Sequence, residues 1–385
     1  MANDHTYAQW VRAATRRLTE AEGEEIISLF DSSVAEPVEL VRRLIEENFR
    51  PPITTRYASV FSECNPFVID ALAARYDVSP ENILCTTGAT NAITLLYRTF
   101  LPSGGHVVVE RPGFDIFADM AEAQGASVDF FDRPAPDFAL DPERVAAAIT
   151  PATRLIVLSN LHNPSGALAH DDALHAIAKI AAARGAMVVV DEVYRDYAGV
   201  EARKRPAAKL HACVLSISSL TKVFGLSTLR CGWIIAAPET LQPVRAFSER
   251  FEFNASKLAH AVAALTLEHG ALFDRYAENI IAAARPVMRR RFDALVSAGL
   301  LAGRLPDYGC ICFPRVVGVD DTRRLSDWLA GEYGVIVVPG ECFSAPGHVR
   351  IGFALEPEIL DAALTRLGQG LEARRRAGST RALAG

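Results

Sequence analysis

Short apolar runs alternate with amphipathic segments between residues 83 and 236. The runs are nearly continuous in β-branched and aliphatic residues, which is typical of strands buried on both faces. Helical periodicity is predicted between them, over 89–101, 113–125 and 171–185. This alternation predicts an α/β fold with a large domain whose mostly parallel, seven-stranded sheet lies between helices. The predicted strands are ILCTT (83–87), HVVVE (106–110), SVDFF (127–131), RLIVLS (154–159), AMVVVD (186–191), VLSIS (214–218) and GWIIAA (232–237).

The two ends of the chain carry a different pattern. Residues 1–50 read mostly as helix, and an Ala-rich helical region over 256–299 leads into short strand-like runs, CICFPRV (310–316) and HVRIGFAL (348–355). We therefore expect a large α/β domain over 51–275 and a smaller α+β domain built from 1–50 and 276–385. The tail from about residue 372 is expected to be a loose terminus.

Composition excludes several classes of protein. Half of the 385 residues are apolar and 22% are charged, which fits a folded chain rather than a disordered one. The net charge of −6 gives no electrostatic footprint for nucleic acid or an anionic membrane. No apolar run approaches the roughly 18 residues of a membrane span. Seven cysteines without a CxxC pair indicate free thiols in the cytoplasm, and no His/Cys cluster has metal-site spacing, so no metal is expected.

Lysine is rare in this chain, since only five of the 40 basic residues are lysines (179, 204, 209, 222 and 257). Lys222 lies among small hydroxyl residues in SISSLTKVFGLSTLRCGW, just after a predicted strand. Only lysine offers an amine that can lose its proton and form a Schiff base with a carbonyl. Arg230 follows eight residues later, where it could bind a phosphate with two N–H groups. A surface lysine and an ordinary salt bridge are the alternatives for these two residues.

Ligands of open parallel sheets bind beyond the carboxyl ends of the strands. Asp191 ends an apolar strand, where a buried carboxylate needs a partner such as a protonated ring nitrogen, although a helix N-cap is an alternative. The GATNA segment (88–92) opens a helix after a strand, and helix N-termini bind anions. Neither GxxxxGK nor GxGxxG occurs, so nucleotide binding has little support.

Seven segments in order resemble the pyridoxal-phosphate-dependent class I/II aminotransferases of fold type I, the aspartate-aminotransferase-like family. The resemblance covers residues 30–370, and its segments are TTGATNAI, ERPGFDIF, SNLHNPSGA, DEVY, SSLTKVFGLSTLRCGW, VVPGECF and HVRIGFAL. It implies that the large domain binds pyridoxal 5'-phosphate and that amino acids and 2-oxo acids are the small-molecule substrates.

The resemblance also implies residue roles. Lys222 would form the Schiff base with the cofactor and later carry a proton, and Asp191 would pair with the ring nitrogen. Tyr194 and Asn163 would bind the ring hydroxyl. Lys222, Asp191 and Tyr194 are thus the expected catalytic residues.

Further residues are assigned to binding by the same resemblance. Arg350 would grip the substrate α-carboxylate, with Asn163 beside it. Phe114 would stack on the cofactor ring, and the phosphate would lie on Gly88, Ala89, Thr90, Ser219 and Arg230. Tyr57 would reach the phosphate of a neighbouring subunit, which implies a homodimer. The segments around Tyr57 and Tyr308 depart from the family pattern near the expected substrate pocket.

The expected function is transfer of an amino group from an L-amino acid to a 2-oxo acid, within amino acid metabolism. A lyase, decarboxylase or cyclase that uses the same cofactor is an alternative. A non-catalytic ligand-sensing domain of a DNA-binding regulator is a remote one, because the first 50 residues are acidic and too few for a linker and a DNA-reading module. No second arginine can be assigned to a dicarboxylate side chain, which disfavours strict aspartate specificity.

Overall fold

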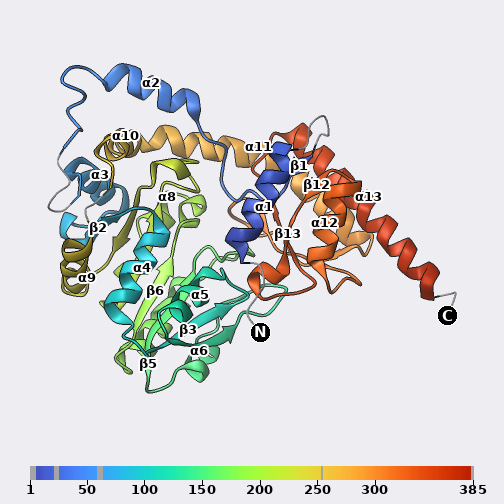
Figure 1. Ribbon diagram of the computed structural model, residues 1–385, viewed down its shortest axis with the longest axis horizontal. Helices are drawn as coiled ribbons and strands as arrows, with labels where there is room; N and C mark the ends of the chain where they lie inside the picture. The colour runs from blue at the N-terminus through green and yellow to red at the C-terminus, as the bar shows by residue number, and fades with distance from the viewer. Residues whose placement is uncertain (1–5, 21–25, 59–63, 253–254, 383–385) are drawn as a thin grey trace.

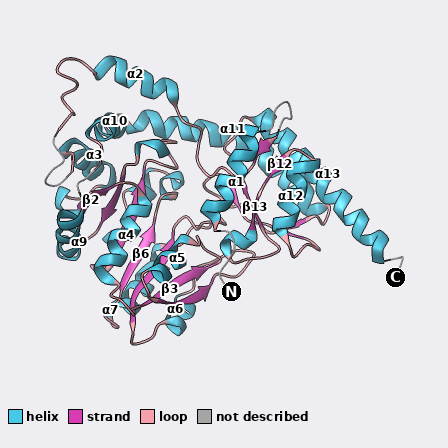
Figure 2. Ribbon diagram, viewed as in Figure 1, coloured by secondary structure: helices cyan, strands magenta, loops and turns pink. Residues whose placement is uncertain are grey.

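A seven-stranded sheet forms the centre of the larger part of the molecule (Figures 1 and 2). The computed structural model describes residues 6–20, 26–58, 64–252 and 255–382, with side chains as far as residue 377. The strand order is β2-β8-β7-β6-β5-β3-β4, and every neighbouring pair is parallel except the two that involve β8. The predicted mostly parallel sheet is confirmed. Its strands are β2 (Ile83–Thr86), β3 (His106–Arg111), β4 (Ser127–Asp132), β5 (Thr153–Ser159), β6 (Met187–Asp191), β7 (Val214–Ser219) and β8 (Gly232–Ile235).

Helices cover both faces of this sheet, because alternate strand residues point to opposite sides. Leu155 and Val157 of β5 pack with α4, α5 and α9, whereas Ile156 and Leu158 pack with α6 and α7 on the other face. Near β2 and β8 that second face is covered by α3 and α10. The helices are α3 (Pro66–Tyr76), α4 (Ala89–Phe100), α5 (Ile116–Ala123), α6 (Pro142–Ala148), α7 (Asp171–Ala182), α8 (Val200–Arg203), α9 (Pro238–Phe251) and α10 (Lys257–Glu268).

The chain ends build a second core beside the first (Figure 1). Parallel pairing of β1 with β12 joins the N-terminal segment to the C-terminal one, and β14 lies between β10 and β13. The helices here are α1 (Tyr7–Glu20), α11 (Gly270–Ser297), α12 (Thr322–Glu332) and α13 (Pro357–Ala382). Helix α2 (Val38–Asn48) instead packs through Leu44 into the core of the large sheet and contacts α10 (Figure 1). The strands are β1 (Ile27–Ser28), β9 (Leu301–Ala302), β10 (Ile311–Cys312), β11 (Arg315–Val316), β12 (Val335–Ile336), β13 (Val338–Pro339) and β14 (Val349–Gly352). No helix in the described segments is both long and apolar enough to cross a membrane.

The predicted domain boundary at 275/276 falls within α11. Phe273 and Ala277 of this helix pack into the core of the large sheet, whereas Met288 and Phe292 pack into the second core. The helix is continuous between the two groups (Figure 1). The division into 51–275 and 1–50 with 276–385 stays a prediction, because one helix serves both cores.

Two expectations about local structure were wrong. The run 127–131 was expected to be buried on both faces, but β4 is the edge strand and only Phe131 of it is buried. The helix expected over 113–125 begins at Ile116 and ends at Ala123. The loose tail expected from about residue 372 stays a prediction: α13 continues to Ala382, and its last turns project from the body (Figure 1).

A close backbone approach at Gly352 fixes the N-terminal segment against β14. The Gly352 N–H donates to the Leu29 carbonyl at 2.7 Å, and a Cβ at Gly352 would lie 1.6 Å from the Asp31 carbonyl oxygen. Only glycine fits there, because backbone atoms cannot move aside as a flexible side chain can. This contact brings residues 29–32 next to Arg350, two positions earlier in β14.

Replacing Gly352 by alanine is therefore expected to lower the free energy of unfolding by about 2 kcal/mol or more, because overpacking against backbone forces the two segments apart. Urea denaturation measures the effect. Gly331→Ala is the control, since its added Cβ in α12 would meet only the flexible Arg17 side chain, at 3.3 Å, and alanine favours helix. Equal stability of the two variants would contradict the role of Gly352.

Candidate active site

The amine of Lys222 lies in a hydroxyl-lined position just beyond β7. Its Nζ donates to Ser32 Oγ at 2.9 Å, and Tyr194 OH donates to the same oxygen at 2.9 Å. The Lys222 carbonyl accepts from Tyr197 OH at 2.9 Å, which fixes the backbone. Burial lowers the pKa of the Lys222 amine. The amine is thus held in place and loses its proton more easily than an exposed lysine.

Asp191 ends the next strand, β6, with its carboxylate buried. Its Oδ1 accepts the Val193 N–H at 3.1 Å, so the side chain closes a local turn and does not cap an α-helix. Burial raises the Asp191 pKa to about 7, although the Val193 N–H and the Lys222 ammonium both act to lower it. A protonated ring nitrogen would supply the positive charge that a buried carboxylate needs. Asp191 therefore fits a pyridinium partner.

Arg350 is completely buried beside two aromatic rings that contact each other. Its guanidinium carbon lies 5.0 Å from the Tyr7 ring centre and 5.1 Å from that of Phe343. Nη1 donates to Asn163 Oδ1 at 2.9 Å, while Nη2 donates to the Phe30 carbonyl at 3.0 Å and to Tyr7 OH at 2.6 Å. Nε has no hydrogen-bond partner among the described residues. A buried cation with an unused donor fits an anionic ligand.

Asn163 is positioned by a buried polar chain at the ends of β3 and β5. The Asn163 N–H donates to Ser159 Oγ at 2.9 Å, and that hydroxyl donates to Glu110. Glu110 also accepts the Ser159 N–H at 2.8 Å and pairs with Arg133 at 2.7 Å, with both side chains fully buried. These hydrogen bonds fix the Asn163 backbone against β3 and β5.

Two glycines, Gly88 and Gly232, form a glycine cradle that lets Arg230 and the backbone pack closely where helix α4 begins. Gly88, with φ of +93°, precedes Ala89, and a Cβ on it would lie 2.5 Å from Arg230 Nη2. A Cβ on Gly232 would lie 2.6 Å from the Gly88 carbonyl carbon. Arg230 is exposed and donates from Nη2 to the Thr87 carbonyl at 3.2 Å. An arginine, a glycine cradle and a helix N-terminus together fit a phosphate group.

Most of the other predicted site residues lie at the same edge of the sheet. Ser219 pairs with Gly232 in the β7–β8 ladder, and Thr90 is the second residue of α4. Phe114 follows β3 and meets the Tyr7 ring edge-on, with ring centres 5.6 Å apart. The structure thus brings Phe114 beside Tyr7 and places Ser219 next to the glycine cradle.

Tyr57 is the exception. It is 37% exposed, and its described ring contact is with Lys257 Nζ at 4.6 Å, at the start of α10. Among the described residues of this chain, no hydrogen bond or ring contact connects Tyr57 with the residues around Lys222. Its predicted role depends on a neighbouring subunit and stays a prediction.

Sequence reasoning missed three residues of this site. Ser32 joins Lys222 to Tyr194, Tyr197 holds the Lys222 backbone, and Tyr7 bonds Arg350. The sequence did offer a clue to Tyr197, because this residue lies three positions after Tyr194, which was predicted to be in the site. Ser32 and Tyr7 had none, since they come from the N-terminal segment and reach the site only through tertiary packing.

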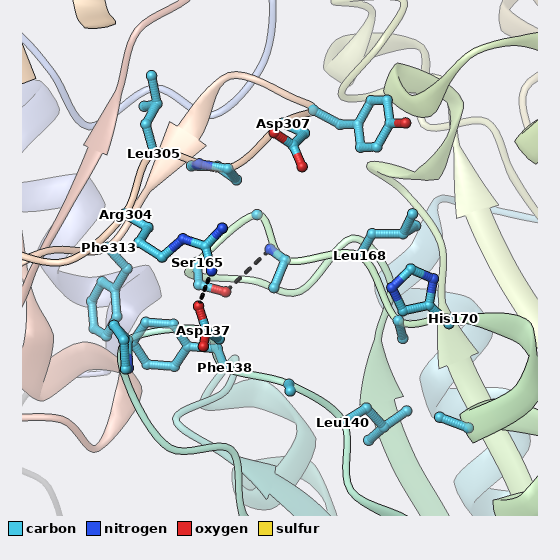
Figure 3. A pocket seen from close by; sticks show the side chains of 18 residues that line it. Asp137, Phe138, Leu140, Ser165, Leu168, His170, Arg304, Leu305, Asp307 and Phe313 are labelled. Carbon is cyan, nitrogen blue, oxygen red and sulfur yellow. Dashed lines mark hydrogen bonds and ion pairs between the residues drawn. The ribbon is translucent and has the colours of Figure 1, made fainter.

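A cavity of about 390 Å³ lies nearby, between the loops that follow β4 and β5 and the segment before β10 (Figure 3). Asp137 and Arg304 form an ion pair in its lining, and Tyr308 also lines it. None of the predicted site residues belongs to this lining. In the described segments, no group of three or more His, Cys, Asp or Glu side chains is arranged to hold a metal ion.

Comparison with known proteins identifies the family. The sequence model of the family "Aminotransferase class I and II" matches residues 55–367. The chain therefore belongs to the class I and II aminotransferases, and the expected enzyme class, a pyridoxal-phosphate-dependent aminotransferase, is confirmed with it.

Individual relatives of this chain are consistent with its membership of the family. The aspartate/prephenate aminotransferase of Thermus thermophilus is 30% identical over 320 residues, which cover 80% of this chain and 81% of that protein. Capreomycidine synthase of Streptomyces vinaceus is 30% identical over 304 residues, covering 78% and 77%. The solved structure of a PLP-dependent aminotransferase from Streptococcus suis superposes with a TM-score of 0.81 at 26% identity, covering 93% of this chain and 96% of that one.

The buried Asp191 carboxylate is expected to destabilise the protein without cofactor as pH rises. Its folded pKa of about 7 exceeds the unfolded value of about 3.9, so the native state binds more protons and stability falls between those pH values. Asp191→Asn should therefore stabilise the cofactor-free protein by on the order of 2–4 kcal/mol at pH 8 and by much less near pH 4.

Thermal and urea unfolding from pH 4 to pH 8 check this prediction. Asp293→Asn, on the exposed side of α11, is the control for loss of a carboxylate. A gain for Asp191→Asn that is equal at every pH would contradict the raised pKa.

Proposed function

We propose that this enzyme transfers the amino group of an L-amino acid to a 2-oxo acid, with Lys222 as the residue to which pyridoxal 5'-phosphate attaches. The observation that carries the proposal is that a half-buried amine and a buried carboxylate lie beyond neighbouring strand ends. Burial lowers the pKa of Lys222 and raises that of Asp191 to about 7. A cofactor aldehyde and a protonated ring nitrogen are the partners that these two groups fit.

Each end of the cofactor has a counterpart in the site. The glycine cradle at Gly88, with Arg230 and the start of α4, would hold the phosphate. Asp191 would keep the ring nitrogen protonated, and Tyr194 and Asn163 would bind the ring hydroxyl. When bound, pyridoxal phosphate withdraws electrons from the substrate Cα.

The protein side chains would supply the remaining steps. Arg350 would bind the substrate α-carboxylate, and Asn163, which already bonds Arg350 Nη1, would orient it. Once released from the cofactor, the Lys222 amine would carry the proton that leaves Cα. Ser32 and Tyr194, which hold this amine in the present structure, would keep it near that position.

A second candidate is conversion of an amino acid without an amino acceptor, as by a lyase, decarboxylase or cyclase. The relative from Streptomyces vinaceus is named a synthase, not an aminotransferase, and matches the chain as closely in identity as the aspartate/prephenate aminotransferase does. The two candidates differ in their need for an amino acceptor. Turnover that requires an added 2-oxo acid would support the transaminase, and conversion of an amino acid without acceptor would support the second candidate.

We also propose that the enzyme acts as a cytoplasmic homodimer. Large apolar side chains are exposed at the end of α9 and the start of α10, namely Phe251 at 54% and Leu258 at 52%. Tyr57 contacts Lys257, the neighbour of Leu258 in α10. Exposed apolar groups beside a predicted cross-subunit tyrosine are what an isologous interface would use.

Lys222→Ala is expected to lower transamination by about 10²–10⁴-fold or more, because both cofactor attachment and proton transfer lose their amine. A visible absorption band that appears when pyridoxal phosphate is added to the wild type, and is bleached by amino acids without acceptor, should be absent from the variant. Lys179→Ala, exposed on α7, is the matched control and should behave as the wild type. Substantial turnover by cofactor-loaded Lys222→Ala would contradict the assignment.

Leu258→Glu is expected to convert the dimer to a monomer, because a charge would be buried at the interface. Size-exclusion chromatography with light scattering measures the mass. Val200→Glu, at a site that is 50% exposed, is the control and should remain dimeric. A wild type that is monomeric at working concentrations would overturn the homodimer.

A further inference from the structure

Arg350 has little donor capacity left for a substrate carboxylate. A guanidinium offers a carboxylate two forks of paired N–H groups, one from Nη1 with Nη2 and the other from Nε with Nη2. Both forks need an N–H of Nη2. In this structure the Phe30 carbonyl takes one Nη2 hydrogen at 3.0 Å, and Tyr7 OH lies 2.6 Å from the same nitrogen.

The two partners of Nη2 differ in how easily they can leave. Phe30 contributes a main-chain carbonyl in the segment fixed against β14 by the Gly352 contact. Tyr7 contributes only a phenol, at the first residue of α1. Ala14 is the one fully buried residue among those of α1. The Tyr7 phenol is therefore the partner that can move.

The Nε–H of Arg350 supports the same conclusion. This N–H is buried, has no partner among the described residues and forms one half of the Nε/Nη2 fork. An unsatisfied buried donor costs free energy unless a ligand occupies it. The other half of the fork is an N–H of Nη2, the nitrogen whose two partners are the Phe30 carbonyl and the Tyr7 hydroxyl.

We propose that the Tyr7 phenol occupies, in the enzyme without substrate, the place on Arg350 that the substrate α-carboxylate takes, so that amino acids and 2-oxo acids bind by displacing it. Tyr7 is then a specificity-determining residue, because only a ligand with a carboxylate recovers the bond that is lost. The proposal rests on the function proposed above for Arg350.

Contacts of its backbone and its ring hold Tyr7 beside Arg350. Its N–H donates to Asp115 Oδ2 at 2.5 Å, and its ring meets Phe114 edge-on with ring centres 5.6 Å apart. The Phe343 ring lies 5.7 Å away, centre to centre. These contacts involve the backbone and the ring, so the hydroxyl can be removed without disturbing them.

Tyr7→Phe tests the proposal because it removes only the hydroxyl. The probes are propionate and 3-phenylpropionate, each paired with its neutral amide, and calorimetry of the cofactor-loaded enzyme measures their dissociation constants. We expect Tyr7→Phe to bind the carboxylates about three- to tenfold more tightly than the wild type, since no hydrogen bond to the charged guanidinium must be broken. Binding of the amides should not change. The KM for amino acid substrates should fall more than kcat changes.

Tyr333→Phe, at the residue that follows α12 and meets the Trp328 ring edge-on, is the matched control and should leave the dissociation constants unchanged. Unchanged or weaker carboxylate binding by Tyr7→Phe would overturn the proposal, and weaker binding would show that the phenol contacts the carboxylate.

Variants of Arg350 distinguish an error in the Tyr7 proposal from an error in the function proposed for Arg350. Arg350→Gln and Arg350→Lys should both weaken carboxylate binding if Arg350 is the carboxylate site. If a folded Arg350 variant binds the carboxylates as the wild type does, or if no form of the enzyme binds them, the Arg350 assignment itself is wrong. If neither Arg350 variant folds, the comparison of Tyr7→Phe with Tyr333→Phe still decides the Tyr7 proposal.

Discussion

The burial of one guanidinium, that of Arg350, governs how the two ends of the chain are arranged. A buried cation is costly without hydrogen-bond partners, and those of Arg350 come from segments far apart in sequence: Tyr7 and Phe30 near the N-terminus and Asn163 after β5. All three must reach β14 near the other end of the chain. The pairing of β1 with β12 and the close approach at Gly352 are the backbone arrangements that permit this meeting.

Much of the large domain could be predicted from the sequence, because parallel strands buried on both faces leave a strong apolar pattern. The rule that ligands lie beyond strand ends then placed Asp191, Lys222 and Asn163 correctly at one edge. The same reasoning failed for β4. Its run SVDFF is apolar enough to predict a strand, but position in the strand order determines whether both faces are covered, and local sequence does not contain that order.

The parts of the site that could not be predicted are those made by tertiary packing. Ser32 lies in a loop without a motif, and Tyr7 lies in a helix whose pattern shows only an apolar face. Neither residue type suggests chemistry by itself. The sequence also does not show where one core ends and the other begins. Helix α11 has one amphipathic pattern throughout its length, yet Phe273 packs into the core of the large sheet and Met288 into the second core.

The connection between β7 and β8 carries both Lys222 and Arg230, and the Leu220 N–H closes it by donating to the Cys231 carbonyl at 3.0 Å. Because β8 runs antiparallel to β7, the start of β8 and the end of β7 meet at the same edge. The amine and the guanidinium are therefore the two ends of a single hairpin-like link rather than parts of separate elements. The length of this one link therefore sets the separation between the amine proposed to hold the cofactor and the guanidinium proposed to hold its phosphate.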